Sequence, residues 1–109
     1  MLFDSSTTQV YVGPILVAPP GANWFWRESC HMFVAPDANV EALHIMAIWI
    51  GLIPKWFQEP RGRMPHYDLT PNKRRQAIAV GALSVDAREE TRIVRLWREY
   101  QQTKGQIVT

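Results

Sequence analysis

The 109-residue chain is poor in cysteine and in long apolar runs, and each shortage excludes a class of protein. Its single cysteine, Cys30, rules out an intramolecular disulfide and a zinc site built from several thiolates, and it fits a reducing compartment. The most apolar run, Ile45–Ile53, has nine residues, whereas a membrane span needs about 20. No basic stretch precedes the apolar residues at the N-terminus, so a secretion signal is not indicated. We expect no membrane partner and a cytoplasmic location, in a bacterial or phage-infected cell.

Several catalytic motifs are missing too. The six glycines are scattered, so there is no phosphate-cradling loop, and no serine lies in a nucleophile-elbow context. No two histidines lie one helical turn apart, as metal ligands on a helix often do. We therefore expect no cofactor, no metal-binding residues and no metal that folding requires. Three histidines (His31, His44 and His66) with Asp68 could still build a metal site, and this alternative stays open.

Length and composition fit one globular domain, with 47% apolar and 20% charged residues. Residues 1–8 are expected to be disordered, which leaves 9–109 as the domain. Strand-like runs and helical patterns alternate, which predicts an α/β (or α+β) fold: a small sheet packed with about three helices in a single compact domain. The predicted strands are 9–12, 15–18, 30–34, 55–58, 67–69 and 83–85, and the predicted helices are 38–50, 71–80 and 87–103.

Capping residues set the predicted helix boundaries. Asp37 is expected to cap the first helix and Gly51 to end it. Thr70-Pro71 is a strong helix start, because threonine caps and proline prefers the first helical position. Asp86 is expected to cap the third helix, which 104–105 would close.

The first predicted helix is apolar on nearly all sides. Its expected core stripe is Val40, Leu43, Ala47 and Ile50, and that of the third helix is Ile93, Leu96, Trp97 and Tyr100. A helix with so few polar positions is either deeply buried or part of an interface. Together with the Trp-rich segment 24–26, it predicts a homo-oligomer.

Positive charge is concentrated in one segment. Residues 55–75 hold six of the twelve basic side chains and only two acidic ones. Lys73, Arg74 and Arg75 lie in the first turns of the second helix, where the helix dipole favours anions. A bound anion would explain them, and neutralisation by Asp68 with screening by solvent is the alternative. His66 lies just upstream, on the same side of an extended segment as Asp68, and could serve proton transfer, ligand binding or a structural hydrogen bond.

These residues belong to a longer pattern of motifs. In order, the pattern comprises Val10-Tyr11-Val12, Cys30-His31-Met32, Asp37, Glu41-Ala42-Leu43-His44, Gly51-Leu52, Trp56-Phe57-Gln58, His66-Tyr67-Asp68-Leu69-Thr70, Arg74 and Gly81-Ala82. Over about residues 9–86 the chain thereby resembles DUF4031, a family of uncharacterised proteins of bacteria and tailed phages.

The resemblance implies a shared site but no activity. The residues it suggests for that site are His44, His66, Tyr67, Asp68 and Arg74. Members of the family usually carry an acidic residue directly after the first strand, where this chain has Gly13-Pro14. If that acid is a metal ligand or a base, its loss argues against catalysis.

Three functions remain as hypotheses. The first is a small-ligand-binding domain for a phosphate-bearing molecule, with a nucleotide as the favoured ligand; its ligand-binding residues would be His44, His66, Tyr67, Asp68, Lys73 and Arg74. The second is a phosphoester or nucleotide hydrolase, with His66 as general acid/base and Asp68 orienting it. The third is an interaction protein that binds a host protein or nucleic acid through the basic loop and exposed tryptophans. The first two predict one pocket that contains both His44 and His66.

Overall fold

The computed structural model describes residues 8–21, 27–61 and 63–106, and for 104–106 the backbone alone. The elements, in chain order, are β1 (Tyr11–Val12), β2 (Leu16–Val17), β3 (Glu28–Phe33), α1 (Val40–Trp49), the 3₁₀ helix η1 (Pro54–Trp56), β4 (Tyr67–Leu69), α2 (Pro71–Ala79), β5 (Leu83–Ser84) and α3 (Ala87–Gln106). Residues 1–7 and the segment Trp24–Trp26 lie outside the described residues, whereas Thr8 is buried.

The sheet is built around β3, the longest strand. β4 pairs antiparallel with β3, and so do β1 and β2, while β5 pairs parallel with β1. Between β1 and β2 the chain has three residues, 13–15, against two on β3, 30–31. This extra residue is a bulge-like irregularity, which changes the local direction of a strand. The result is a small mixed sheet with three helices, as the sequence predicted.

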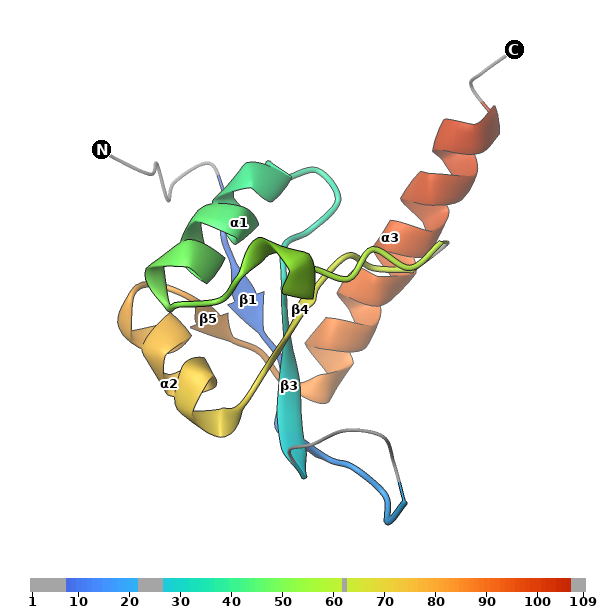
Figure 1. Ribbon diagram of the computed structural model, residues 1–109. Helices are drawn as coiled ribbons and strands as arrows, with labels where there is room; N and C mark the ends of the chain where they lie inside the picture. Colours follow the sequence, from blue (N-terminus) through green and yellow to red (C-terminus); the bar gives the residue numbers. More distant parts are fainter. Residues whose placement is uncertain (1–7, 22–26, 62, 107–109) are drawn as a thin grey trace.

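The helices cover the two faces of this sheet (Figure 1). α1 and α2 pack on one face, where side chains of β3 and β4 alternate into the core. The core side chains that alternate onto this face are Cys30, Met32, Tyr67 and Leu69, and Phe33 at the end of β3 is buried as well. α3 lies on the opposite face, and its Trp97 indole donates a 2.7 Å hydrogen bond to the Val34 carbonyl.

The helix ends follow mostly local signals. Thr70 caps α2 as predicted, its hydroxyl accepting from the Lys73 N–H at 3.2 Å. Gly51 has φ +87° and follows α1, and the Leu52 N–H donates to the Ala47 carbonyl at 2.9 Å. This is the Schellman arrangement, in which glycine adopts the left-handed conformation cheaply. The prediction of Asp37 as the first cap is wrong: Asn39 caps α1 by accepting from the Glu41 N–H.

Two other local predictions are corrected. Residues 55–58 do not form a strand, because Pro54 opens the 3₁₀ helix η1 and only Gln58 bridges to His66. Asp86 does accept from the Glu89 N–H at 2.9 Å, as the predicted cap of α3, but this helix continues to Gln106, past the predicted end. Within the described residues, no helix is both long and apolar enough to cross a membrane.

Five of the eight residues predicted for the two core stripes are buried. Leu43, Ala47 and Ile50 of the first stripe are buried, and so are Ile93 and Trp97 of the third-helix stripe. The remaining members, Val40, Leu96 and Tyr100, are at least one third exposed. Ile48 and Trp49 are exposed on the outer side of α1, in agreement with its apolar character on nearly all sides.

Candidate functional site

Side chains along β4 point alternately to the two faces of the sheet. Tyr67 and Leu69 are buried in the core, so His66 and Asp68 project from the other face, toward α3. The pairing of β3 with β4 places His31 opposite Asp68 on this same face. The sequence had identified His66 and Asp68 as neighbours, and the sheet adds His31.

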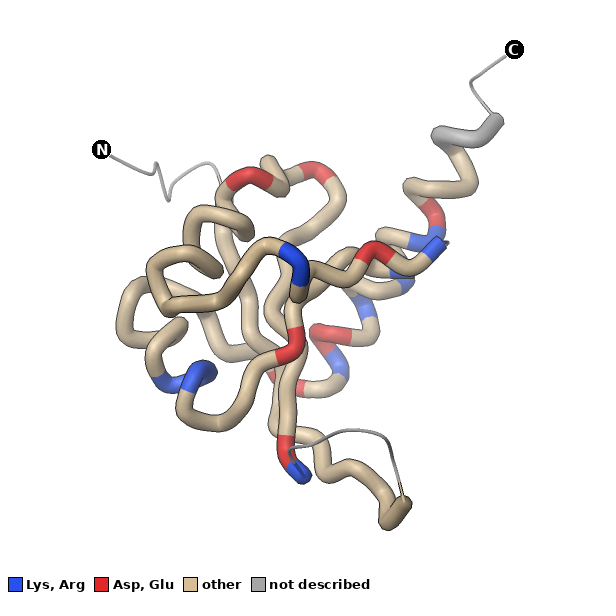
Figure 2. Tube along the Cα trace, in the orientation of Figure 1, with Lys and Arg blue, Asp and Glu red and all other residues tan. Residues whose placement is uncertain are grey.

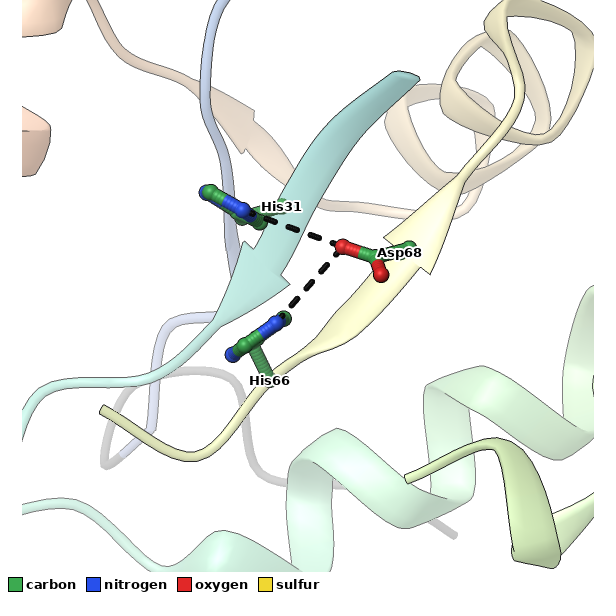
Figure 3. A group of neighbouring side chains, drawn as sticks. All are labelled: His31, His66 and Asp68. Atoms are coloured by element: carbon green, nitrogen blue, oxygen red, sulfur yellow. Dashed lines mark ion pairs between the residues drawn. The ribbon is translucent and has the colours of Figure 1, made fainter. Parts of the chain in front are cut away.

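The two histidine rings of this group both point toward one carboxylate oxygen of Asp68 (Figure 3). His31 Nε2 lies 3.7 Å and His66 Nε2 lies 3.6 Å from Asp68 Oδ1. The two imidazole rings meet edge to face, with their centroids 4.7 Å apart. One nitrogen of each ring and one carboxylate oxygen thus surround a common point.

The remaining polar atoms of these side chains are held by the protein. His66 Nδ1 donates to the Met64 carbonyl at 2.9 Å, and His31 Nδ1 donates to Glu90 Oε2 at 2.7 Å. Neither a carbonyl nor a carboxylate can donate, so the proton of each neutral ring is on Nδ1 and Nε2 carries a lone pair. Gln58 donates to Asp68 Oδ2, which leaves Oδ1 to face the two rings.

The group is partly buried and rich in negative charge. The side chains of His66 and Glu90 are each 14% exposed, and that of His31 is 31% exposed, so solvent reaches one side of the group. The hydrogen bond to Glu90 raises the pKa of His31; burial opposes this effect, and the charges of Glu90 and Asp68 support it. Two carboxylates beside two imidazoles therefore favour a bound positive charge.

Glu90 reaches the group from α3, and sequence reasoning missed it. A Cβ built on Gly13 would lie 1.7 Å from Glu90 Oε1, so the carboxylate occupies space that any side chain at position 13 would need. The resemblance implied that this chain had lost an acidic group at that point. Instead, Glu90 supplies a carboxylate beside Gly13.

His44 and Tyr67 form a separate pair on the core face of β4. Burial raises the pKa of Tyr67, with a smaller effect from Glu41, so the phenol keeps its proton and can donate to His44 Nδ1 at 2.8 Å. Phe57 packs edge to face on the His44 ring. The expected pocket containing both His44 and His66 is therefore not observed, because they lie on opposite sides of the strand.

The basic residues of α2 also have partners within the protein. Lys73 Nζ donates to the carbonyl of Ile50, the C-cap residue of α1. Arg74 donates from Nε to the Gly13 carbonyl at 2.9 Å and from Nη2 to Ser84 Oγ at 2.7 Å. Positions with Lys and Arg occur in α2, in α3 and in loops (Figure 2). The structure therefore offers a structural reason for the cations that suggested an anion.

Among the described residues, His31, His66 and Asp68 form a group whose ligand atoms all lie within 4.8 Å of one another. Spacing along the chain did not reveal this group, since strand pairing joins His31 and Asp68, which are 37 positions apart. His31 could have been found by placing it opposite Asp68 in an antiparallel pair. Glu90 left no comparable signal, because its position depends on how α3 docks.

The fold and the site define a small α/β domain with a histidine–carboxylate group on one face of its sheet. A family model described as Protein of unknown function (DUF4031) matches residues 15–96, so the chain belongs to that family, as its motifs predicted. The match spans His31, His66, Asp68 and Glu90. Neither the curated proteins nor the solved structures gave a match. The function therefore has to be argued from the site.

Proposed function

We propose that this protein binds a divalent transition-metal cation through His31, His66 and Asp68, and uses it to bind and hydrolyse a phosphate-bearing small molecule such as a nucleotide. The observation that carries the proposal is the convergence of two Nε2 atoms on one carboxylate oxygen. Two histidines with one carboxylate are a recurrent ligand set for divalent metals, with coordination positions left open.

The distances fit such an ion. Ligands held at about 2.1 Å in a tetrahedral site lie roughly 3.4 Å from one another. The two nitrogens are 3.7 Å and 3.6 Å from Asp68 Oδ1, and the three ligand atoms all lie within 4.8 Å of one another, so side-chain rotations would bring them into range.

The hydrogen bonds around the ligands support the same proposal. Histidines that bind metals almost always donate their other ring N–H to a carboxylate or a backbone carbonyl, which fixes the tautomer. Both arrangements are present here, at Glu90 for His31 and at Met64 for His66. Gln58 orients the Asp68 carboxylate in the same way.

Three protein ligands would leave room for water and for substrate. Zn²⁺ held in this way would lower the pKa of bound water to about 7 and polarise a phosphoryl oxygen, which is what hydrolysis requires. The guanidinium of Arg74 donates to the carbonyl of Gly13, the residue that faces the Glu90 carboxylate, and to Ser84 Oγ.

The cation also resolves a conflict in the sequence-based hypotheses. A phosphate placed directly beside Asp68 and Glu90 would be repelled by two negative charges. Lys73, one half of the expected phosphate clamp, is bound to Ile50. A metal ion between the carboxylates and the phosphate removes the repulsion, so the metal, rather than Lys73, would hold the ligand.

Metal titration of chelator-treated, tag-free protein tests the proposal. Calorimetry with Zn²⁺ and Mn²⁺ should show one site per chain, which His66→Gln and Asp68→Asn abolish. His44→Gln is the matched control, since His44 lies on the other face of β4, and it should bind like the wild type. No binding by the wild type, or an equal loss in the His44 variant, would contradict the proposal.

Hydrolysis is tested separately. Metal-loaded protein should cleave nucleotides or a nitrophenyl phosphoester, and Asp68→Asn should not. If the metal binds without turnover of any phosphoester, the hydrolytic part is wrong and metal binding stands. We place this chemistry in the cytoplasm, because the free, buried thiol of Cys30 fits a reducing compartment.

One observation favours a second candidate, binding of nucleic acid by α3. Arg88, Arg92 and Arg95 line one open depression along this helix, with Thr91 between them. Arginines in such a row contact phosphates, and such binding weakens steeply with salt. Salt-dependent binding of a DNA duplex that is lost in Arg88→Ala/Arg95→Ala would support it, and its absence at low salt would refute it.

A further inference from the structure

Glu90 is the member of the histidine–carboxylate group that comes from a helix. It lies in the first part of α3, where the Glu90 N–H donates to the Asp86 carbonyl at 3.0 Å. The Asp86 cap thus fixes the turn that carries it. From there its Oε2 accepts from His31 Nδ1 at 2.7 Å, the shortest contact in the group that involves a histidine.

Gly13 provides an independent observation about the same carboxylate. A Cβ at this position would lie 1.7 Å from Oε1 and 2.9 Å from Cδ of Glu90, closer than atoms can approach. The backbone does not itself require glycine there, since among the described residues the glycines with positive φ are Gly21, Gly51 and Gly81, and Gly13 is not one of them. Glycine at position 13 therefore has a steric explanation, since the absence of a side chain leaves room for the Glu90 carboxylate.

We propose that Glu90, in the space left by Gly13, is a positioning residue for the metal site: it holds His31 with Nε2 toward Asp68 and so sets the affinity for the cation. This inference rests on the proposed function in one respect, that His31 is a metal ligand. It adds that α3, which supplies none of the three ligands His31, His66 and Asp68, controls how tightly they bind.

The physical effect has two parts. The carboxylate accepts the Nδ1 proton, which excludes the tautomer whose Nε2 is protonated and unable to bind a metal. It also makes the imidazole a stronger donor to the metal through its negative charge. Removal of such a partner typically weakens metal binding by about 10–100-fold.

Metal titration of four variants separates this role from a general structural one. Glu90→Ala removes the carboxylate, and the methyl group added by Gly13→Ala displaces it. Each substitution should therefore weaken Zn²⁺ binding by about 10–100-fold. Glu90→Gln should weaken it less, since its amide oxygen can still accept from His31. In the Glu90→Ala background, Gly13→Ala should cost nothing further, because the two changes remove one interaction.

Glu89→Ala is the matched control. Glu89 is adjacent in α3 but pairs with Arg92, so its removal should leave Zn²⁺ affinity unchanged. Gly13→Ala protein that binds Zn²⁺ like the wild type would overturn the proposal. So would a double variant that binds more weakly than Glu90→Ala alone.

The tautomer of His31 is a readout that does not need the metal. Imidazole ¹⁵N spectra of metal-free protein at alkaline pH should show His31 protonated on Nδ1 in the wild type and in Glu89→Ala. Glu90→Ala and Gly13→Ala should shift it toward the Nε2-protonated form. If the wild type binds no metal, the proposed function fails, and these spectra still decide whether Glu90 positions His31. A wild-type His31 protonated on Nε2 would overturn the inference.

Discussion

Replacement of Arg74 by alanine is predicted to destabilise the protein without any ligand. The guanidinium joins α2 to the end of β1 through the Gly13 carbonyl and to β5 through the Ser84 hydroxyl, at 2.9 Å and 2.7 Å. Arg74→Ala removes both bonds and leaves two acceptors that only water can satisfy. An anion-binding role alone predicts the opposite, because loss of a cation from a helix N-terminus is mildly favourable.

The expected magnitude follows from these two contacts. A hydrogen bond from a charged donor contributes about 1.5–3 kcal/mol, and partial exposure of Arg74 favours the lower value, so the pair is worth about 3 kcal/mol. Relief of the helix dipole returns up to about 1 kcal/mol. The net loss of about 2 kcal/mol corresponds to a fall in Tm of roughly 8 °C for a domain of this size.

Thermal melts of the wild type, Arg74→Ala and Arg75→Ala provide the assay. Arg75 is the matched control, because it sits in the same helix turns and makes one long contact, 3.4 Å to Asn72. Its replacement should change stability by less than about 0.5 kcal/mol. Equal melting temperatures for Arg74→Ala and Arg75→Ala would refute the reasoning. Phosphate that raises the Tm of the wild type and not of Arg74→Ala would restore a direct role for Arg74 in anion binding.

Three further outcomes are expected. Chelation should lower the Tm of metal-loaded protein yet leave it folded by circular dichroism, since the buried side chains of β4, Tyr67 and Leu69, lie on the face away from the metal; unfolding by the chelator would contradict this. Burial raises the pKa of the Cys30 thiol to about 12, so Ellman's reagent should react with it only after unfolding, and rapid reaction of the native protein would count against burial. Self-association through the exposed Ile48 and Trp49 of α1 should appear in sedimentation and disappear in Ile48→Lys, whereas a wild-type monomer at high concentration would exclude it.

The parts of the fold that sequence predicted depend on local chemistry. The start of α2 follows from Thr70-Pro71, and the end of α1 from Gly51, because a cap needs only residues within one turn. The prediction of a strand at 55–58 was wrong because the contacts of this segment with the rest of the protein override its local propensity. Its aromatic residues have high β propensity, but Pro54 and the packing of this segment against α1 favour a 3₁₀ turn.

The site residues likewise fall into those that local sequence predicts and those that tertiary contacts bring in. His66 and Asp68 could be paired from the sequence, because residues two apart in a strand face the same side. His31 and Glu90 join them through strand pairing and helix docking, which no local pattern encodes. Lys73 led to the prediction of a bound anion, but its ammonium donates to the Ile50 carbonyl at the C-terminus of α1, where the helix dipole favours a cation.

β4 gives this small domain a division between stability and chemistry. Tyr67 and Leu69 are almost completely buried, and their burial is what holds the strand against α1 and α2. Asp68 lies between them in this strand, and His66 directly precedes it in a bridge to Gln58, so the core has already fixed the backbone that carries both side chains. Ligands placed in this way lose little further freedom when a cation binds, which is the advantage of building a site on regular elements rather than on a loop. Substitutions at His66 and Asp68 should therefore change metal binding much more than folding, and those at Tyr67 should do the reverse.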